Sequence, residues 1–228
     1  MDGMYRFFVN EKHQDYFKLS PTLLKHLKVL RLQAHEKFIC IYQQRFYLCQ
    51  RVGEQAQILE ALNDQHEYKH TLVLFAAIIK PKNFEWLIQK ATELGVKSFY
   101  PLVTAHTNPK YVAACQTKWE RLQQIVQNAA EQAFRNDLMQ VHAPLSFNEA
   151  ITMICGRGYL AHEQASGVIS KWNFRGDLSF YVGPEGGFSA TEVAAAQAQG
   201  IAIVSLGKRI LRAETAALAL LANVAIDN

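Results

Sequence analysis

The chain has 228 residues, of which half are apolar and 19% are charged, and its formal net charge at pH 7 is +4. This composition excludes a largely disordered protein and supplies enough apolar side chains for one large core or two small ones. No apolar run is long enough to cross a membrane, and the first residues do not form the apolar segment of a secretory signal. The four cysteines have neither C-x-x-C spacing nor a zinc-type cluster. We therefore expect a soluble, cytoplasmic protein with reduced cysteines and no metal site.

Residues 1–69 have the pattern of short strands around one helix. Strands are expected at residues 5–9, 38–42, 45–49 and 55–60. Ser20 can cap the helix through its hydroxyl, and Pro21 suits the first helical position. The leucines that follow share one apolar face of this helix, namely Leu23, Leu24, Leu27 and Leu30. The pattern predicts a small β-barrel that ends in a polar linker at residues 63–69.

Positive charge is concentrated in residues 17–51 of this first part. The segment contains seven lysines and arginines but one acidic residue, Glu36, so its charge of +6 exceeds that of the whole chain. Such a basic patch favours binding to phosphates, because phosphate contacts release condensed counterions. A set of solvated surface side chains is the alternative interpretation.

From His70 onward, apolar runs alternate with amphipathic stretches. Strands are expected at residues 71–79, 96–102, 158–161, 178–182 and 201–206. Helices are expected at residues 81–94, 119–134, 147–154, between Ser189 and Gly200, and at 214–226. This alternation predicts an α/β domain with a mostly parallel sheet, in which ligands bind beyond the carboxyl ends of the strands.

An unusual loop follows the strand at 178–182. It reads Gly183-Pro184-Glu185-Gly186-Gly187, and its glycines allow the backbone to approach a ligand closely while the proline stiffens it. The order matches neither the dinucleotide fingerprint nor the P-loop, so a phosphate cradle is not indicated. An ordinary tight turn before a helix is the alternative.

A second unusual loop follows the strand at 201–206. It brings three cations, Lys208, Arg209 and Arg212, close to Glu214. Arg212 could face a group that carries or develops negative charge, or it could pair with Glu214 in a solvated cluster. The free N–H groups of the helix that begins near Thr215 would face the same place.

Several motifs, in this order along the chain, resemble those of a known family. They are H-L-K-V-L-R at 26–31, A-T-E-L-G-V at 91–96, A-A-E-Q-A-F-R at 129–135, G-P-E-G-G-F-S at 183–189 and L-G-K-R-I-L-R-A-E-T-A at 206–216. The sequence thereby resembles the RsmE family, the 16S ribosomal RNA (uracil-N3) methyltransferases of the SPOUT superfamily. The resemblance runs from about residue 5 to residue 222.

The resemblance implies an architecture and a set of partners. Residues 1–69 would form a PUA-like RNA-binding β-barrel, and residues 70–228 a SPOUT α/β methyltransferase domain with a C-terminal trefoil knot, a rare exception to unknotted chains. S-adenosyl-L-methionine would bind in the knot, 16S rRNA or the assembled small ribosomal subunit would be the substrate, and the protein would be a homodimer with its site near the subunit interface. No metal and no membrane would be involved.

The resemblance also implies site residues. Cofactor contacts would come from three loops, through Leu160, His162, Gly183, Pro184, Glu185, Gly186, Gly187, Leu206, Gly207, Ile210, Leu211, Ala213 and Thr215. We expect Arg212 to stabilise the charge of a deprotonated uracil and Glu214 or Glu185 to orient the loops. No residue is an obvious general base. RNA contacts are expected from Arg6, Lys25, Lys28, Arg31 and Arg135, with His162 as a further candidate.

The sequence departs from the family pattern after the strand at 99–103. Family members often carry an acidic residue and an arginine there, whereas this chain has Ala105 and His106, so RNA contact at this place is not implied. Ala213 also replaces a common threonine. Two other functions fit the same motifs: a SPOUT methyltransferase with another target, such as a ribose 2′-hydroxyl, and a non-catalytic RNA-binding assembly factor. The second would not need the paired loops.

Overall fold

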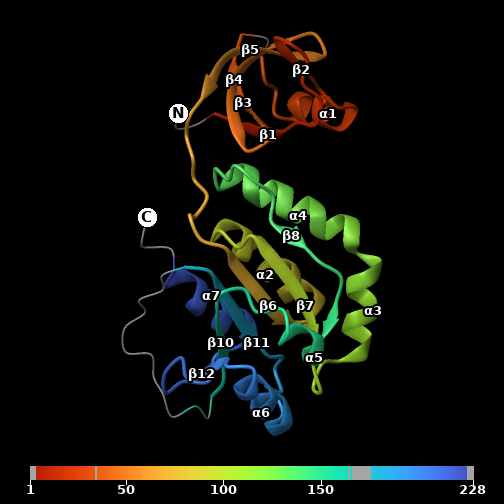
Figure 1. Cartoon of the computed structure of the whole chain (residues 1–228). Coiled ribbons are helices and arrows are strands. Elements are labelled where there is room, and N and C mark those ends of the chain that lie inside the picture. The colour runs from red at the N-terminus through yellow and green to blue at the C-terminus, as the bar shows by residue number, and fades with distance from the viewer. Residues whose placement is uncertain (1–3, 34, 164, 166–175, 225–228) are drawn as a thin grey trace. The chain divides into compact units, whose positions relative to one another are not determined.

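The computed structural model describes residues 4–33, 35–163, 165 and 176–224 (Figure 1). The chain forms two compact units, the first made of residues 1–67 with 130–137 and the second of residues 68–129 with 138–228. The first unit therefore includes a second segment, residues 130–137, which the sequence pattern predicts to be part of the α/β domain. The cause of this grouping is a set of contacts between residues distant in sequence.

The first unit contains a curled five-stranded sheet in the order β1-β3-β4-β5-β2 (Figure 1). Its strands are β1 (Arg6–Phe8), β2 (Tyr16–Lys18), β3 (Lys37–Tyr42), β4 (Arg45–Val52) and β5 (Gln55–Leu62). β3 and β4 form the predicted hairpin, in which Gln43 and Gln44 both have positive φ, as a two-residue turn between twisted strands requires. β2 was not predicted, because three residues are too few to show an alternating pattern.

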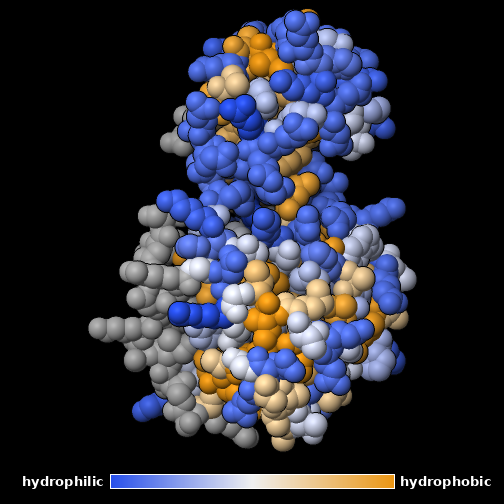
Figure 2. Space-filling model, in the orientation of Figure 1, coloured by the Kyte–Doolittle hydropathy of each residue, from blue (hydrophilic) through white to orange (hydrophobic). Residues whose placement is uncertain are grey.

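One helix, α1 (Pro21–Val29), packs against this sheet. The hydroxyl of Ser20 accepts a hydrogen bond from the backbone N–H of Leu23, so the predicted cap is confirmed. Leu27 is fully buried beside Phe17 and Phe38, and the other predicted leucines are partly buried against the same core. On the face shown in Figure 2, hydrophilic side chains cover most of the first unit.

A carboxylate connects residues 130–137 to the rest of the first unit. Glu67 accepts hydrogen bonds from Nε and Nη2 of Arg135, at 2.9 and 2.7 Å, and from the backbone N–H groups of Asn136 and Asp137. Arg6 contributes from β1, because its Nε donates to the carbonyl of Glu131 at 2.8 Å. These contacts bring together residues about 70 to 125 positions apart.

The second unit contains a parallel sheet in the order β12-β10-β11-β6-β7-β8, with β9 also beside β7. Its strands are β6 (Leu72–Ala77), β7 (Ser98–Val103), β8 (Gln140–Val141), β9 (Leu145–Ser146), β10 (Arg157–Ala161), β11 (Leu178–Val182) and β12 (Ala202–Val204). Every pairing in this sheet is parallel, which confirms the predicted α/β class.

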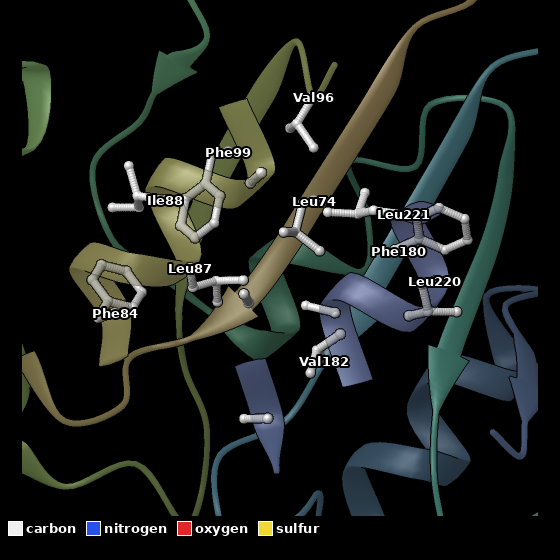
Figure 3. Close-up of a cluster of buried hydrophobic side chains, with 14 of the residues drawn as sticks. Leu74, Phe84, Leu87, Ile88, Val96, Phe99, Phe180, Val182, Leu220 and Leu221 are labelled. Atoms are coloured by element: carbon white, nitrogen blue, oxygen red, sulfur yellow. The ribbon is translucent and has the colours of Figure 1, made fainter. Parts of the chain in front are cut away.

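Helices cover both faces of this sheet. They are α2 (Pro81–Glu93), α3 (Pro109–Thr117), α4 (Trp119–Gln132), α5 (Phe147–Ala150), α6 (Ala190–Ala198) and α7 (Ala213–Ala222). Leu74 of β6 packs with α2 and α7 (Figure 3), whereas its neighbours Val73 and Phe75 pack with α5 and α6 on the opposite face. Because consecutive strand residues point to opposite faces, a strand covered on both sides must be apolar throughout, as β6 is.

The structure differs from the predicted helices in three places. α3 was not predicted, since its apolar residues form no long stripe; Asn108 caps it by accepting from Lys110 N–H. α5 ends at Ala150, well before residue 154. The predicted end of the last helix at residue 226 lies outside the described residues, and α7 ends at Ala222.

The trefoil knot stays a prediction, because residues 164 and 166–175 of the β10–β11 connection also lie outside the described part of the chain.

Candidate functional site

A cavity of about 380 Å³ lies in the second unit, beyond the carboxyl ends of β10, β11 and β12. Three loops line it, the ones that follow these three strands. The lining residues are Ala161, His162, Glu163, Val182, Gly183, Pro184, Glu185, Gly186, Gly187, Phe188, Leu206, Gly207, Arg209, Ile210, Leu211, Arg212, Ala213 and Ala216. The volume falls in the usual range for small-molecule and cofactor sites, and the position is the one where parallel sheets bind ligands.

The glycine loop after β11 needs its glycines for close packing. The N–H of Gly187 donates to the carbonyl of Pro184 at 2.9 Å, and Gly187 has φ of +68°, which residues with a Cβ rarely adopt. A Cβ on the buried Gly183 would lie 3.2 Å from the carbonyl carbon of Gly187 and from the ring of Phe188. The loop is therefore folded back on itself, with its backbone forming a wall of the cavity.

The end of the glycine loop is the start of α6, as predicted. The hydroxyl of Ser189 accepts from Glu192 N–H, and the Glu192 carboxylate accepts from Ser189 N–H at 2.8 Å. This reciprocal capping box satisfies free N–H groups of the first turn. The loop is thus fixed at its exit by α6 and at its entry by β11.

A row of stacked rings supports the strand that leads into the glycine loop. Tyr181 of β11 stacks on Phe75 with ring centroids 4.6 Å apart, Phe75 on Tyr100 at 4.9 Å, and Tyr100 on His142 at 4.0 Å. The Tyr181 hydroxyl donates to the carbonyl of Ala150, and burial raises its pKa, so it stays protonated. The site is therefore built on a rigid part of the sheet.

The second loop reaches the cavity through an unusual backbone. Gly207 has φ of +109°, a conformation that is strained for any residue with a Cβ. Arg212 is the N-cap of α7, with an extended backbone and no side-chain cap bond, so its side chain is not used to cap the helix. The first turn of α7 therefore begins at the wall of the cavity, which Ala213 and Ala216 line one turn apart.

The two charged residues predicted to act in catalysis are separated. Arg212 is exposed, lines the cavity and forms no ion pair with any described residue. Glu214 lies outside the lining, and its carboxylate accepts a hydrogen bond from Asn83 Nδ2 of α2 at 3.0 Å. The alternative in which Arg212 and Glu214 neutralise each other is therefore wrong. Glu214 instead connects the start of α7 to α2.

Most of the predicted cofactor contacts line the cavity, with two exceptions. Leu160 is fully buried in β10 with the core beneath α5 and α6. Thr215 lies outside the lining because a residue two positions after Ala213 is turned by about 200° around the helix. Six further residues line the cavity: Ala161, Glu163 and Arg209 lie within the predicted loops, whereas Val182, Phe188 and Ala216 lie outside them. Helical spacing from Ala213 could have indicated Ala216.

The predicted RNA contacts differ in exposure. Lys25, Lys28 and Arg31 are exposed on or just after α1. Arg6 is partly buried, with its guanidinium 3.3 Å from the ring centroid of Phe134. Arg135 is only 3% exposed and is paired with Glu67, so the prediction that it contacts RNA requires correction: this arginine holds residues 130–137 in the first unit.

The described residues contain neither a metal-binding cluster nor a membrane-spanning helix. Within residues 4–33, 35–163, 165 and 176–224, no group of three or more His, Cys, Asp and Glu side chains could hold a metal ion. In the same part of the chain, no helix is both long and apolar enough to cross a membrane.

Known proteins resemble this chain in both sequence and structure. Residues 66–225 match the family described as RNA methyltransferase domain. Ribosomal RNA small subunit methyltransferase E of Mesomycoplasma hyopneumoniae is 37% identical over 222 residues, which cover 96% of this chain and 97% of that protein. The protein of the same name from Synechocystis is 36% identical over 219 residues, covering 90% and 71% of the two chains.

Two solved structures have the same fold over nearly the whole chain. Ribosomal RNA small subunit methyltransferase E of Neisseria gonorrhoeae, bound to S-adenosyl methionine, superimposes with a TM-score of 0.87 at 26% identity and covers 96% of this chain and 95% of its own. A Legionella pneumophila protein with bound S-adenosyl methionine has a TM-score of 0.85 at 27% identity, with 96% of each chain covered. The fold is thus of the SPOUT type, and this chain belongs to the ribosomal RNA small subunit methyltransferase E family.

Proposed function

We propose that this chain uses S-adenosylmethionine to methylate N3 of a specific uridine in 16S ribosomal RNA. One observation carries the proposal: Arg212, which pairs with no described carboxylate, lies at a cavity built from glycine-rich backbone. The names of the relatives support rRNA of the small subunit as the substrate, and the bound molecule in two similar structures supports the cofactor.

The cavity suits the cofactor chemically. S-adenosylmethionine supplies an electrophilic methyl group on a positively charged sulfur. Backbone N–H and C=O groups of the two loops can hydrogen bond to its polar edges, since the glycines leave this backbone open. Val182, Leu206 and Leu211 add apolar surface, and the carboxylates of Glu163 and Glu185 favour positive charge. Cofactor binding would thus rest on shape and backbone groups, with few charged side chains.

Arg212 would act on the base. Uracil N3 becomes a strong nucleophile when it loses its proton, and the negative charge then spreads onto the two adjacent carbonyl oxygens. A guanidinium offers five N–H donors in a fixed plane and stays protonated, so it can stabilise this charge without moving a proton itself. The hydrogen bond between Glu214 and Asn83 holds the start of α7, and with it the backbone of Arg212. The remaining work is positioning the two reactants.

The first unit would bind RNA. Lys25, Lys28 and Arg31 present exposed charges there, and a second cavity of about 260 Å³ lies where β1, β2 and α1 meet, with Lys18 among its lining residues. Phosphate contacts by these cations would make RNA affinity fall steeply with salt.

A homodimer would cover Ile210, whose side chain is 86% exposed although it is large and apolar. A ribosomal RNA substrate agrees with the predicted cytoplasmic location.

The test replaces Arg212 and follows cofactor binding and methylation separately. Arg212→Ala should lower the methylation rate of small subunits by about 100-fold or more, the typical effect of losing one donor to a developing charge. Its dissociation constant for S-adenosylmethionine, measured by calorimetry, should stay within about twofold of the parent value. Arg157→Ala is a matched control, since Arg157 is exposed at the other end of β10.

Nucleoside mass spectrometry of the product identifies the target. Appearance of 3-methyluridine in 16S rRNA supports the proposal, whereas a 2′-O-methyl nucleoside would replace it with the alternative target. A parent chain that does not bind S-adenosylmethionine would indicate the non-catalytic factor. Full methylation by Arg212→Ala would remove the proposed role of that residue.

A further inference from the structure

His106 lies at the tip of a closed turn between β7 and α3. Thr104 and Thr107 close this turn: the N–H of Thr104 donates to Oγ1 of Thr107 at 2.9 Å, and the N–H of Thr107 donates to the carbonyl of Thr104 at 3.1 Å. Both threonines are buried, while Ala105 and His106 are exposed. The turn is therefore a rigid support that presents two residues.

Both presented residues contact the glycine loop or its exit. The Nδ1 atom of His106 lies 3.2 Å from the carbonyl oxygen of Gly187. The N–H of Ala105 donates to Oε1 of Glu192 at 2.9 Å, while the other oxygen of that carboxylate accepts from Ser189 in the capping box. The turn is thus attached at two points. The backbone N–H of Ala105 bonds to the Glu192 carboxylate of α6, and the imidazole of His106 contacts the carbonyl of Gly187 in the glycine loop.

The contact between His106 and Gly187 determines which ring nitrogen carries the proton. A carbonyl oxygen only accepts hydrogen bonds, so Nδ1 must carry the proton. The ring also packs closely on the loop, because a Cβ on Gly186 would lie 3.1 Å from Cβ of His106. Gly186 thereby leaves room for the histidine.

Three glycines in five residues would otherwise leave this wall of the cavity free to adopt other conformations. Gly186 and Gly187 both line the cavity, and His106 does not. The imidazole therefore acts on the loop from its outer side and has no direct contact with the space inside.

We propose that His106 is a positioning residue, which holds the backbone of Gly186 and Gly187 in the conformation that binds the methyl donor. The inference rests on the proposed function in that the donor is S-adenosylmethionine. It also gives the departure at residue 106 a role in this chain: the histidine supports the cofactor loop.

The test uses three variants of the full chain. His106→Leu removes the N–H donor, whereas His106→Asn keeps one, because the Asn Nδ2 atom can take the place of Nδ1. His70→Leu is the control, since His70 is exposed at the amino end of β6, opposite to the cavity. Each variant is measured for S-adenosylmethionine affinity by calorimetry, for methylation rate against KM for RNA, and for hydrogen–deuterium exchange of residues 182–188 without cofactor.

His106→Leu should weaken S-adenosylmethionine binding by about two- to tenfold, the usual effect of one lost hydrogen bond, with KM for RNA unchanged. It should also speed exchange in residues 182–188. His106→Asn and His70→Leu should stay within about twofold of the parent chain in binding and should show its exchange rates.

Parent-like cofactor affinity in His106→Leu would overturn the inference, whatever its exchange rates. An equal loss in His106→Asn would also overturn it, since the hydrogen bond could then not be the cause. A parent chain that binds no S-adenosylmethionine would defeat the proposed function and the donor-binding role of His106 together. In that case the exchange rates would still show whether the histidine holds the loop.

Discussion

Replacing Glu67 with glutamine tests how residues 130–137 are held in the first unit. The substitution keeps the shape of the side chain but removes the charge opposite Arg135, whose side chain is only 4% exposed. It also puts an NH₂ group where the carboxylate accepts several N–H groups, including those of Asn136 and Asp137. The arginine would then be a buried cation without its main counter-charge.

The size of the effect follows from burial. Breaking a buried ion pair by removing one partner costs about 3–5 kcal/mol. Glu67 is 25% exposed, so water screens part of this pair, and we expect a loss of about 2–3 kcal/mol in the free energy of unfolding. Glu85→Gln is the matched control: it also removes a glutamate between two cations, but Lys118 and Arg121 are 44% and 63% exposed. A surface pair of this kind contributes little to stability, because water screens the charges of the exposed cations.

The measurement must report on the first unit. All three tryptophans lie outside residues 1–67 and 130–137, so tryptophan fluorescence would follow the wrong part of the chain. Native-state hydrogen exchange of β3, β4 and β5 gives the opening free energy of this unit directly. A loss below about 1 kcal/mol for Glu67→Gln, no greater than that of Glu85→Gln, would refute the argument that this pair holds the segment.

Two further predictions concern the second unit and the cavity. The buried Nε2 of His142 has no hydrogen-bond partner among the described residues, and burial lowers the pKa of this imidazole. Folding disfavours the charged form of this ring. The neutral ring therefore makes its full contribution to stability above the unfolded pKa of about 6.5, and this contribution is lost as pH falls below that value. Urea midpoints of His142→Phe should therefore fall less between pH 7.5 and pH 5.5 than those of the parent, and an equal fall would contradict this. Gly207→Ala should cost about 1–3 kcal/mol of stability and should also weaken S-adenosylmethionine binding. Gly53→Ala is the control: Gly53 also has a positive φ and no atom near its Cβ, so this substitution should lower stability alone. Unchanged affinity in Gly207→Ala would show that this backbone does not shape the site.

The features that the sequence determined by itself depend on neighbouring residues. Ser20 and Ser189 cap their helices because a serine hydroxyl at the N-cap can accept a hydrogen bond from the backbone N–H three residues later. β11 has the limits expected from its apolar run, and the two loops follow their strands as expected. Short elements without a long pattern, such as β2 and α3, were missed for the same reason: local patterns identify only what is long enough to repeat.

The tertiary structure decided which charged side chains are free and which are used for support. The sequence places Arg212 and Glu214 two positions apart, yet the path of α2 brings Asn83 to Glu214, 131 positions away in the chain, and leaves Arg212 at the cavity. Arg135 is paired with Glu67 across 68 positions, and His106 meets Gly187 across 81. A single pattern of residues does not specify such contacts, because they depend on where the packing of the whole chain places distant backbone segments.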